Sequence, residues 1–204
     1  MKNNIGLVGF GRWGKIISKN LCKRNLNIFI ATSQNKKKIL SIIEEDKNQS
    51  KIIFFKNYKS MLKKTKLDGI VIASPPSSHE EIAINALNLR IPIFIEKPIS
   101  MNSDSVDKIF KLALRKNVPI IVDYIHLYSP SFRKIKYLTR NRKIFQIISK
   151  GHSFGPVRNY SVLWDRLPHD LSMIRELCNK KNELVIIKND IIKKNKFGMN
   201  IKIT

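Results

Sequence analysis

The sequence predicts an α/β fold in which a parallel sheet carries helices on both faces. Over roughly the first two thirds of the chain, six short apolar runs alternate with stretches of about a dozen residues that have apolar side chains at helical spacing. Strands that are apolar on both faces and alternate with helices form parallel sheets through right-handed crossovers. After about residue 125, strand-like runs follow one another without crossover helices. This change predicts a second α+β domain with a partly antiparallel sheet.

The boundary between the predicted domains lies at residues 122 and 123, giving an N-terminal domain of residues 1–122 and a short second domain of residues 123–204. Ser78 to Glu81 fits a capping box at the start of the fourth helix. The predicted strands of the first domain are 5–10, 27–32, 51–55, 69–74, 92–97 and 119–124, and its helices are 12–25, 35–46, 58–65, 79–90 and 103–117. In the second domain we expect helices at 129–141 and 168–178 and strands at 143–154, 183–194 and 198–204.

The composition is strongly basic, with 39 Lys and Arg against 15 Asp and Glu and a formal net charge of +24. Such a charge raises nucleic acid or an anionic membrane as a partner. However, the clusters at residues 36–38 and 193–194 stand among Asn, Ile and Leu without the aromatic residues of a nucleic-acid groove. Lysine, asparagine and isoleucine are abundant together, as an AT-rich coding bias would produce. We therefore predict no specific nucleic-acid partner, but a general attraction to anionic substrates.

The two cysteines and the apolar runs indicate the compartment. Cys22 and Cys178 lie far apart, without a second cysteine or a histidine at metal spacing, so they read as reduced, buried thiols and no metal site is predicted. The first apolar run is too short for a signal peptide, and no later run approaches a membrane span. We expect a cytoplasmic protein without a membrane partner.

A glycine-rich motif, GFGRWG, separates the first strand from the first helix. In a G-x-G-x-x-G turn, Gly9 permits the tight turn, Gly11 lets the backbone approach a pyrophosphate, and Gly14 lets the helix pack closely on the strand. The helix N-terminus then faces the phosphates. The motif predicts a dinucleotide-binding Rossmann domain, and we include the intervening Phe10, Arg12 and Trp13 among the cofactor-binding residues.

The end of the second strand bears on the choice between NAD and NADP. An acidic residue about twenty positions after the glycines binds the ribose hydroxyls of NAD. Here the strand ends in Thr32 and Ser33, and Lys36 to Lys38 follow. Hydroxyls and cations suit a 2′-phosphate better than a bare ribose, so NADP is favoured over NAD. The three lysines also fit a solvated helix start supplied by the composition.

Two later strands end in residues that a buried strand does not need. The fourth runs into Ser74 and Pro75, with His79 shortly after, and the fifth ends in Glu96 and Lys97 before a proline. Open α/β sheets bind ligands at the carboxyl ends of their strands. Because a buried lysine is costly unless something uses it, we place Lys97 in the site and all five residues near the cofactor.

Together the glycine turn, the segment DGIVIASPPSSHEEIAINALNLRIPIFIEKP and the later LWDRLPHDLSMI resemble the Gfo/Idh/MocA oxidoreductases over nearly the whole chain. The Glu-Lys-Pro tripeptide carries most of the resemblance, followed by the D-x-x-x-H of Asp165 and His169. The resemblance implies an NAD(P)-dependent dehydrogenase that transfers a hydride between a nicotinamide and a hydroxyl or ketone of a sugar or nucleotide sugar. In such enzymes the lysine matching Lys97 stabilises the charge on the reacting oxygen.

The resemblance also implies that His169 is the general acid or base and that Asp165 orients or charges it. Independently, Pro168 suggests that His169 lies in the first turn of a helix, where the helix dipole opposes the imidazolium that Asp165 favours. Candidates for substrate contacts are Tyr124, His126, Arg158 and Trp164, each of which also fits a structural role. The arginine that many family members carry after the position of His126 is replaced here by Leu127.

Family members usually extend roughly a hundred residues further, completing a sheet that shields the site and often mediates oligomerisation. The resemblance therefore presents the chain as shortened at its C-terminus, either by natural truncation or because it is a fragment of a longer reading frame. A homo-oligomer is possible, but the shortening argues against it. The alternative function is a dinucleotide-binding remnant that binds or scaffolds without turnover.

Overall fold

The structure, a computed structural model, describes residues 2–43, 50–149, 162–178, 189–195 and 198–203. The chain divides into two compact units, Met1–Asp123 and Tyr124–Thr204. Each is described below by itself. Within the described residues, no helix is both long and apolar enough to cross a membrane.

The first unit is built on one parallel sheet of six strands with the order β3-β2-β1-β4-β5-β6. This order confirms the predicted Rossmann sheet. The predicted strands are all present, but most end earlier than the sequence indicated. Their bounds are β1 (Asn4–Val8), β2 (Asn27–Ala31), β3 (Lys51–Phe55), β4 (Gly69–Ile72), β5 (Ile93–Ile95) and β6 (Ile120–Val122).

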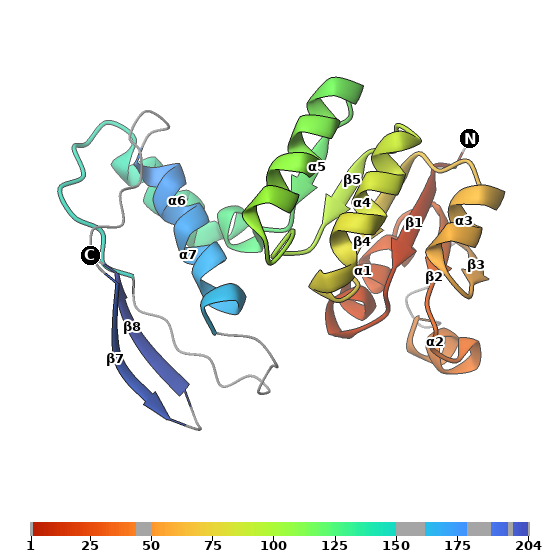
Figure 1. The fold of residues 1–204 in the computed structure, drawn as a ribbon, viewed down its shortest axis with the longest axis horizontal. Helices are drawn as coiled ribbons and strands as arrows, with labels where there is room; N and C mark the ends of the chain where they lie inside the picture. Colours follow the sequence, from red (N-terminus) through yellow and green to blue (C-terminus); the bar gives the residue numbers. More distant parts are fainter. Residues whose placement is uncertain (1, 44–49, 150–161, 179–188, 196–197, 204) are drawn as a thin grey trace. The chain divides into compact units, whose positions relative to one another are not determined.

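Five α-helices connect these strands, at the places that the sequence predicts (Figure 1). The fourth begins at His79 as expected but without the predicted capping box, because the Ser78 side chain makes no cap hydrogen bond and a short 3₁₀ turn, η2 (Pro76–Ser78), leads into the helix. The helices are α1 (Arg12–Cys22), α2 (Lys36–Ile43), α3 (Tyr58–Lys64), α4 (His79–Asn88) and α5 (Ser103–Lys116).

Alternate residues of the central strands fill two separate cores, one on each face of the sheet. On β1, Leu7 joins the core that contains Cys22 of α1 and Ile39 of α2, while Val8 joins the core that contains Ile82 of α4. Neighbouring side chains of a strand point to opposite faces, so a strand covered on both sides must be apolar throughout. This explains why the strands read as unbroken apolar runs rather than as alternating ones.

The strand order places the glycine turn at the switch point of the sheet. The chain runs outward from β1 to β2 and β3, then returns to pair β4 with the other side of β1. The loops that follow β1 and β4 therefore diverge at the carboxyl ends of these two strands, which is where open α/β sheets bind ligands. The predicted cofactor residues of the first unit follow the strands at this edge of the sheet.

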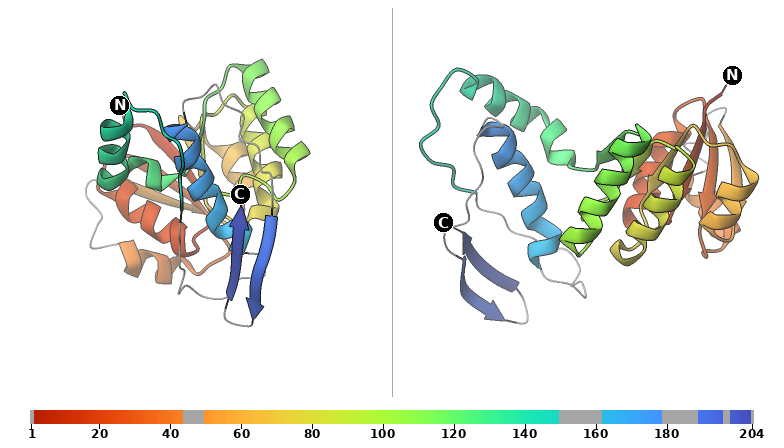
Figure 2. Two further views of the ribbon diagram at one scale, coloured as in Figure 1. Left: turned by 90° about the vertical axis from the view of Figure 1, so that its left-hand side faces the viewer. Right: turned by 45° about the horizontal axis from the view of Figure 1, so that its top comes forward.

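The second unit contains a 3₁₀ turn, η3 (Ile125–Tyr128), two helices that pack on it and on each other, and a two-stranded antiparallel sheet (Figure 2). The antiparallel pairing of the last two predicted strands is confirmed. The strand predicted at 143–154 is wrong over residues 143–149, which form no regular structure, and its remainder lies outside the described residues. The elements are α6 (Pro130–Thr139), α7 (Val162–Leu177), β7 (Asn189–Asn195) and β8 (Gly198–Ile203).

Candidate functional site

The glycine turn after β1 has the shape that a diphosphate requires. Gly9 has a positive φ of 93°, and a Cβ built on it would lie 2.6 Å from the carbonyl oxygen of Ala73. A Cβ on Gly14 would lie 2.4 Å from the Gly9 carbonyl oxygen. A Cβ on Gly11, in contrast, would meet no described atom within 4 Å. Two glycines are thus required for packing, whereas the third keeps open the space beside the start of α1.

The residues between these glycines divide between core and surface. Phe10 is buried in the core on the α1 and α2 side, so only its backbone is available to a ligand. Arg12 is exposed and Trp13 is half-buried, both in the first turn of α1. The side chains of Arg12 and Trp13 therefore remain predicted cofactor contacts. For Phe10, the predicted contact is limited to its main-chain atoms.

The loop after β2 is tied directly to the glycine turn. The Gln34 side chain donates a hydrogen bond from Nε2 to the carbonyl oxygen of Phe10 at 2.8 Å, and its backbone N–H donates to Thr32 Oγ1 at 3.2 Å. Ser33, between them, is exposed. Gln34 is not among the residues predicted for the site, although a long polar side chain just beyond a strand end is a signal in the sequence that could have identified it. This contact fixes Thr32 and Ser33 relative to the glycine turn.

His79 holds two loops of the carboxyl edge together. The ring is fully buried, with Nε2 2.8 Å from the carbonyl oxygen of Ser74 and Nδ1 3.0 Å from that of Pro98. Burial lowers the pKa of His79, while the surrounding carbonyls oppose this change. Because both ring nitrogens face backbone, the side chain joins the loop after β4 to the loop after β5 and offers no polar atom to a cofactor, contrary to the prediction. Ser74 and Pro75 lie in the loop that follows β4, where the Ser74 hydroxyl lies 2.7 Å from that of Ser78.

Glu96 and Lys97 follow β5 directly, and Glu96 has a partner that the sequence analysis missed. Glu96 and Asp123 are both buried, and they directly follow the paired residues Ile95 of β5 and Val122 of β6. Burial, followed by the charge and the hydrogen bond of Asp123, raises the pKa of Glu96 to about 8, against the opposing influence of Lys97. Burial also raises the pKa of Asp123. The sequence does contain a signal for this partner. Asp123 ends the apolar run before Tyr124, just as Glu96 ends the apolar run of the preceding strand.

The second unit brings together several of the other predicted residues. His126 on η3 and His169 on α7 have ring centroids 4.5 Å apart and meet edge to face. Asp165 lies one helical turn before His169, at a spacing that places both residues on one face of α7. His169 is buried, whereas Trp164 is 40% exposed in the first turn. Burial raises the pKa of Tyr124, which precedes η3. Arg158 lies outside the described residues.

The position of His169 in its helix differs from the prediction. α7 begins at Val162, so Pro168 and His169 lie in the helix interior rather than in the first turn. Proline lacks the N–H that would bond to the preceding turn, which is why it commonly marks a helix start and why the expected boundary was wrong. The influence of a helix N-terminus falls off within one turn. It therefore acts on Asp165 and not on His169.

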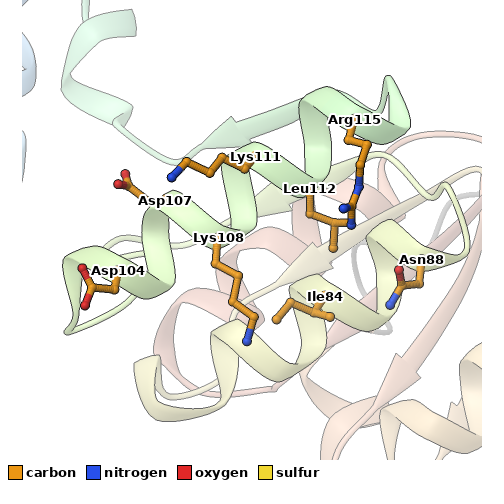
Figure 3. Close-up of a pocket in the computed structure, with 8 residues that line it drawn as sticks. All are labelled: Ile84, Asn88, Asp104, Asp107, Lys108, Lys111, Leu112 and Arg115. Carbon is orange, nitrogen blue, oxygen red and sulfur yellow. The ribbon is translucent and has the colours of Figure 1, made fainter.

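One hollow of the first unit has none of these residues in its lining. It is an open groove of about 740 Å³ between α4 and α5, lined by charged side chains of α5 and by Ile84 and Asn88 of α4 (Figure 3). Lys108 on its wall is paired with Glu80 at 3.1 Å. The lining includes neither the glycine turn nor the Glu-Lys-Pro loop, so we do not assign the groove to the site. Among the described residues, no three His, Cys, Asp or Glu side chains gather in a way that could hold a metal ion.

Comparison with known proteins agrees with this geometry. Residues 3–124 match the model of the Gfo/Idh/MocA oxidoreductase family, described as having an NAD-binding Rossmann fold. A myo-inositol 2-dehydrogenase of Thermotoga maritima is 23% identical over 203 residues, which cover 95% of this chain and 60% of that protein. The chain thus spans about 60% of the length of this curated relative.

Solved structures show the same fold. The chain superposes on a scyllo-inositol dehydrogenase from Lactobacillus casei, crystallised with NAD(H) and scyllo-inositol, with a TM-score of 0.68 and 19% identity over 87% of this chain and 56% of that one. A UDP-N-acetylglucosamine 3-dehydrogenase from Acidithiobacillus ferrooxidans gives a TM-score of 0.56 and 16% identity over 68% of this chain and 43% of that one. At these identities the likeness concerns the fold alone.

Proposed function

The chain belongs to the Gfo/Idh/MocA family of oxidoreductases with an NAD-binding Rossmann fold, and from this we propose that it is an NAD(P)-dependent dehydrogenase acting on a polyol, sugar or nucleotide sugar. The observation that carries the proposal is the glycine turn. Gly9 and Gly14 are closed against backbone while Gly11 faces open space at the start of α1, as binding of a diphosphate requires. Inositol dehydrogenases among the relatives support a polyol substrate, and a UDP-sugar dehydrogenase of the same fold supports testing nucleotide sugars.

When bound, a nicotinamide cofactor would supply the hydride transfer, and the residues of this chain would handle charge and protons. The Lys97 ammonium stabilises the negative charge that develops on the substrate oxygen. His169 removes or returns the proton of the reacting hydroxyl, and its neighbour His126 orients the ring through the edge-to-face contact. Asp165, one turn earlier, favours the protonated form of His169 when the proton is held.

The first experiment tests cofactor binding through Gly11. Replacing Gly11 by Ala adds a methyl group to the space proposed for the diphosphate but meets no described atom of the protein. Gly11→Ala should therefore leave the melting temperature unchanged and weaken nicotinamide-nucleotide binding roughly tenfold or more, a loss of at least about 1.4 kcal/mol. Tight binding of NADPH or NADH by Gly11→Ala, measured by fluorescence titration, would contradict the proposed diphosphate site.

The second experiment tests turnover with inositols and a panel of UDP-sugars. Lys97→Ala should lower kcat by roughly two to three orders of magnitude, as removal of one hydrogen-bond donor to a developing oxyanion does in other enzymes. His169→Ala should lower kcat by a comparable factor. Both variants should still bind cofactor, since neither residue belongs to the glycine turn. Cofactor binding without turnover by the unaltered chain on every substrate would instead favour a dinucleotide-binding protein that is not an enzyme.

The cofactor is proposed to be NADP rather than NAD. Thr32 and Ser33 follow β2 where NAD-specific domains carry an acid, and Gln34 holds this loop against the glycine turn. Thr32→Asp would place a carboxylate beside a 2′-phosphate. The ratio of the Kd values for NADPH and NADH should then shift by roughly tenfold or more toward NADH. A ratio that already favours NADH in the unaltered chain would overturn this preference.

A further inference from the structure

Two buried carboxyl groups lie at the ends of adjacent strands, and one of them belongs to Glu96, which directly precedes Lys97. Ile95 of β5 is paired with Val122 of β6, so the next residues, Glu96 and Asp123, emerge together at the carboxyl edge. The backbone is fixed at this point, because the Asp123 N–H donates to the Ile95 carbonyl at 2.9 Å and the Glu96 N–H donates to that of Ile72 at 2.9 Å. The sheet therefore holds the two side chains next to each other.

Two adjacent buried carboxyl groups require a proton between them. Two ionised carboxylates have only acceptor atoms, so neither could donate a hydrogen bond to the other unless one of them is protonated. Glu96 and Asp123 are only 6% and 8% exposed, which makes a double negative charge costly. Burial and the interaction with Asp123 both raise the pKa of Glu96, whereas for Asp123 burial raises the pKa and the interaction with Glu96 lowers it. Glu96 is therefore the holder of the proton, with Asp123 as the carboxylate.

The second oxygen of Glu96 gives an independent indication. Glu96 Oε1 is buried and has no hydrogen-bond partner among the described residues. An ionised carboxylate would leave partial negative charge on this oxygen with neither water nor a donor to solvate it. A protonated carboxyl group with its hydroxyl directed to Asp123 leaves only a neutral carbonyl oxygen there, at a lower cost.

Lys97 is the cation beside this pair. Its charge lowers the pKa of both Glu96 and Asp123, and its backbone N–H hydrogen-bonds to Glu96. Lys97 and the two carboxyl groups themselves are the charged groups whose influence on the pair is resolved among the described residues. With one proton shared, the pair carries a single negative charge that balances a single ammonium.

We propose that Glu96 and Asp123 share one proton as a unit, and that Asp123 is a positioning residue that acts through Glu96 to hold the Lys97 ammonium at the carboxyl edge of the sheet. This inference rests on the proposed function only for the role of Lys97 in stabilising the charge on the substrate oxygen. The experiments below measure a proton and an amine, without cofactor or substrate, so their failure is distinguishable from failure of the dehydrogenase proposal.

The shared proton can be observed directly by infrared spectroscopy of the full 204-residue chain. At neutral pH we expect the carbonyl band of a protonated carboxylic acid, which disappears as the pH rises through about 8. Glu96→Gln should remove the band. Asp123→Asn should shift its loss to lower pH, because the neighbouring carboxylate that raises the pKa of Glu96 is gone. Asp107→Asn, which alters an exposed aspartate of α5, should change nothing.

Absence of the band from the unaltered chain at neutral pH would overturn the shared proton, and so would a band that persists in Glu96→Gln. The spectrum of the unaltered chain needs no variant to fold. Glu96→Gln also closely matches a protonated glutamate in shape, so it preserves the neutral member of the pair.

The positioning of Lys97 is tested by trace acetylation across a pH series, read by mass spectrometry. Glu96→Gln keeps the Asp123 carboxylate, so Lys97 should react as in the unaltered chain at neutral pH. In the double variant Glu96→Gln, Asp123→Asn, no carboxylate of the pair is left to hold the ammonium, and Lys97 should react faster than in the unaltered chain. The exposed Lys111 of α5 is the internal control. An unchanged Lys97 profile in the double variant would overturn the positioning role.

Discussion

Gly14 is the residue at which absence of a side chain matters most for the fold. Its hypothetical Cβ would lie 2.4 Å from the carbonyl oxygen of Gly9, an atom of the backbone that cannot rotate away. Gly9 is itself held against Ala73 and Ser74 at the end of β4. The close packing of α1 on the first strand therefore depends on this position, whereas Gly11 is open.

Gly14→Ala should consequently destabilise the first unit by about 2 kcal/mol or more, because a backbone segment must move to relieve the overlap. Denaturant unfolding monitored by circular dichroism measures this change. Gly11→Ala is the matched control, with the same added methyl group and no expected loss. Equal stability of the two variants would contradict the packing derived from the turn.

Glu96 should make the stability of the chain depend on pH. Its pKa is about 8 in the folded chain and near its ordinary value of 4.5 when unfolded, so the folded state binds the extra proton. The contribution of Glu96 is fully present below pH 4.5 and is lost as the pH rises through about 8. In Glu96→Gln, thermal unfolding over this range should fall less steeply with pH than in the unaltered chain. Parallel curves for the two proteins would contradict the buried, protonated state of Glu96.

The strands and helices of the first unit occupy the predicted places, but the residues at which they end could not be predicted from the spacing of apolar residues. The predicted fourth, fifth and sixth strands each extend beyond the observed end, over residues 73–74, 96–97 and 123–124. These residues form the carboxyl-edge loops that contain Ser74, Glu96 and Asp123. The end of α5 shows the same point for a helix, since Asn117 adopts the left-handed conformation with φ 54° and its N–H bonds back to Ala113 and Leu114.

Asn117 permits a matched pair of substitutions at the end of α5. Asn117→Ala should cost about 1 kcal/mol, since alanine tolerates the left-handed conformation poorly, and Asn117→Gly should be neutral or slightly stabilising. Both variants remove the same amide side chain, so the difference between their melting temperatures reports the cost of the left-handed backbone conformation for alanine. A Gly variant less stable than the Ala variant would contradict a left-handed cap at this position.

At the scale of the whole molecule, the two principal cores belong to the first unit. The buried members of both clusters lie between Leu7 and Val118, within Met1–Asp123. A folding unit of this size with a covered sheet on both faces can bury enough apolar surface to be stable alone. The glycine turn, the loop after β2 and the pair Glu96 and Asp123 are all contained in it.

Residues 1–123 expressed alone should therefore fold cooperatively and bind the nicotinamide nucleotide with an affinity within about threefold of that of the full chain, since no proposed diphosphate contact is removed. Turnover should be absent, because Asp165 and His169 belong to the second unit. Calorimetry of unfolding and fluorescence titration with NADPH measure the two properties. A fragment that fails to fold would show that the second unit is needed for stability.

The parallel α/β sheet, its six strands, the glycine turn and the family could all be predicted from the sequence, because apolar periodicity and a local motif are properties of short segments. The residue that lies opposite each side chain could be found only in the folded structure. It placed His79 between two carbonyl groups, Gln34 against the glycine turn and Asp123 beside Glu96. It also put His169 in the interior of α7. Such contacts join residues up to about thirty positions apart, and their geometry depends on strand order and register, which no local pattern contains.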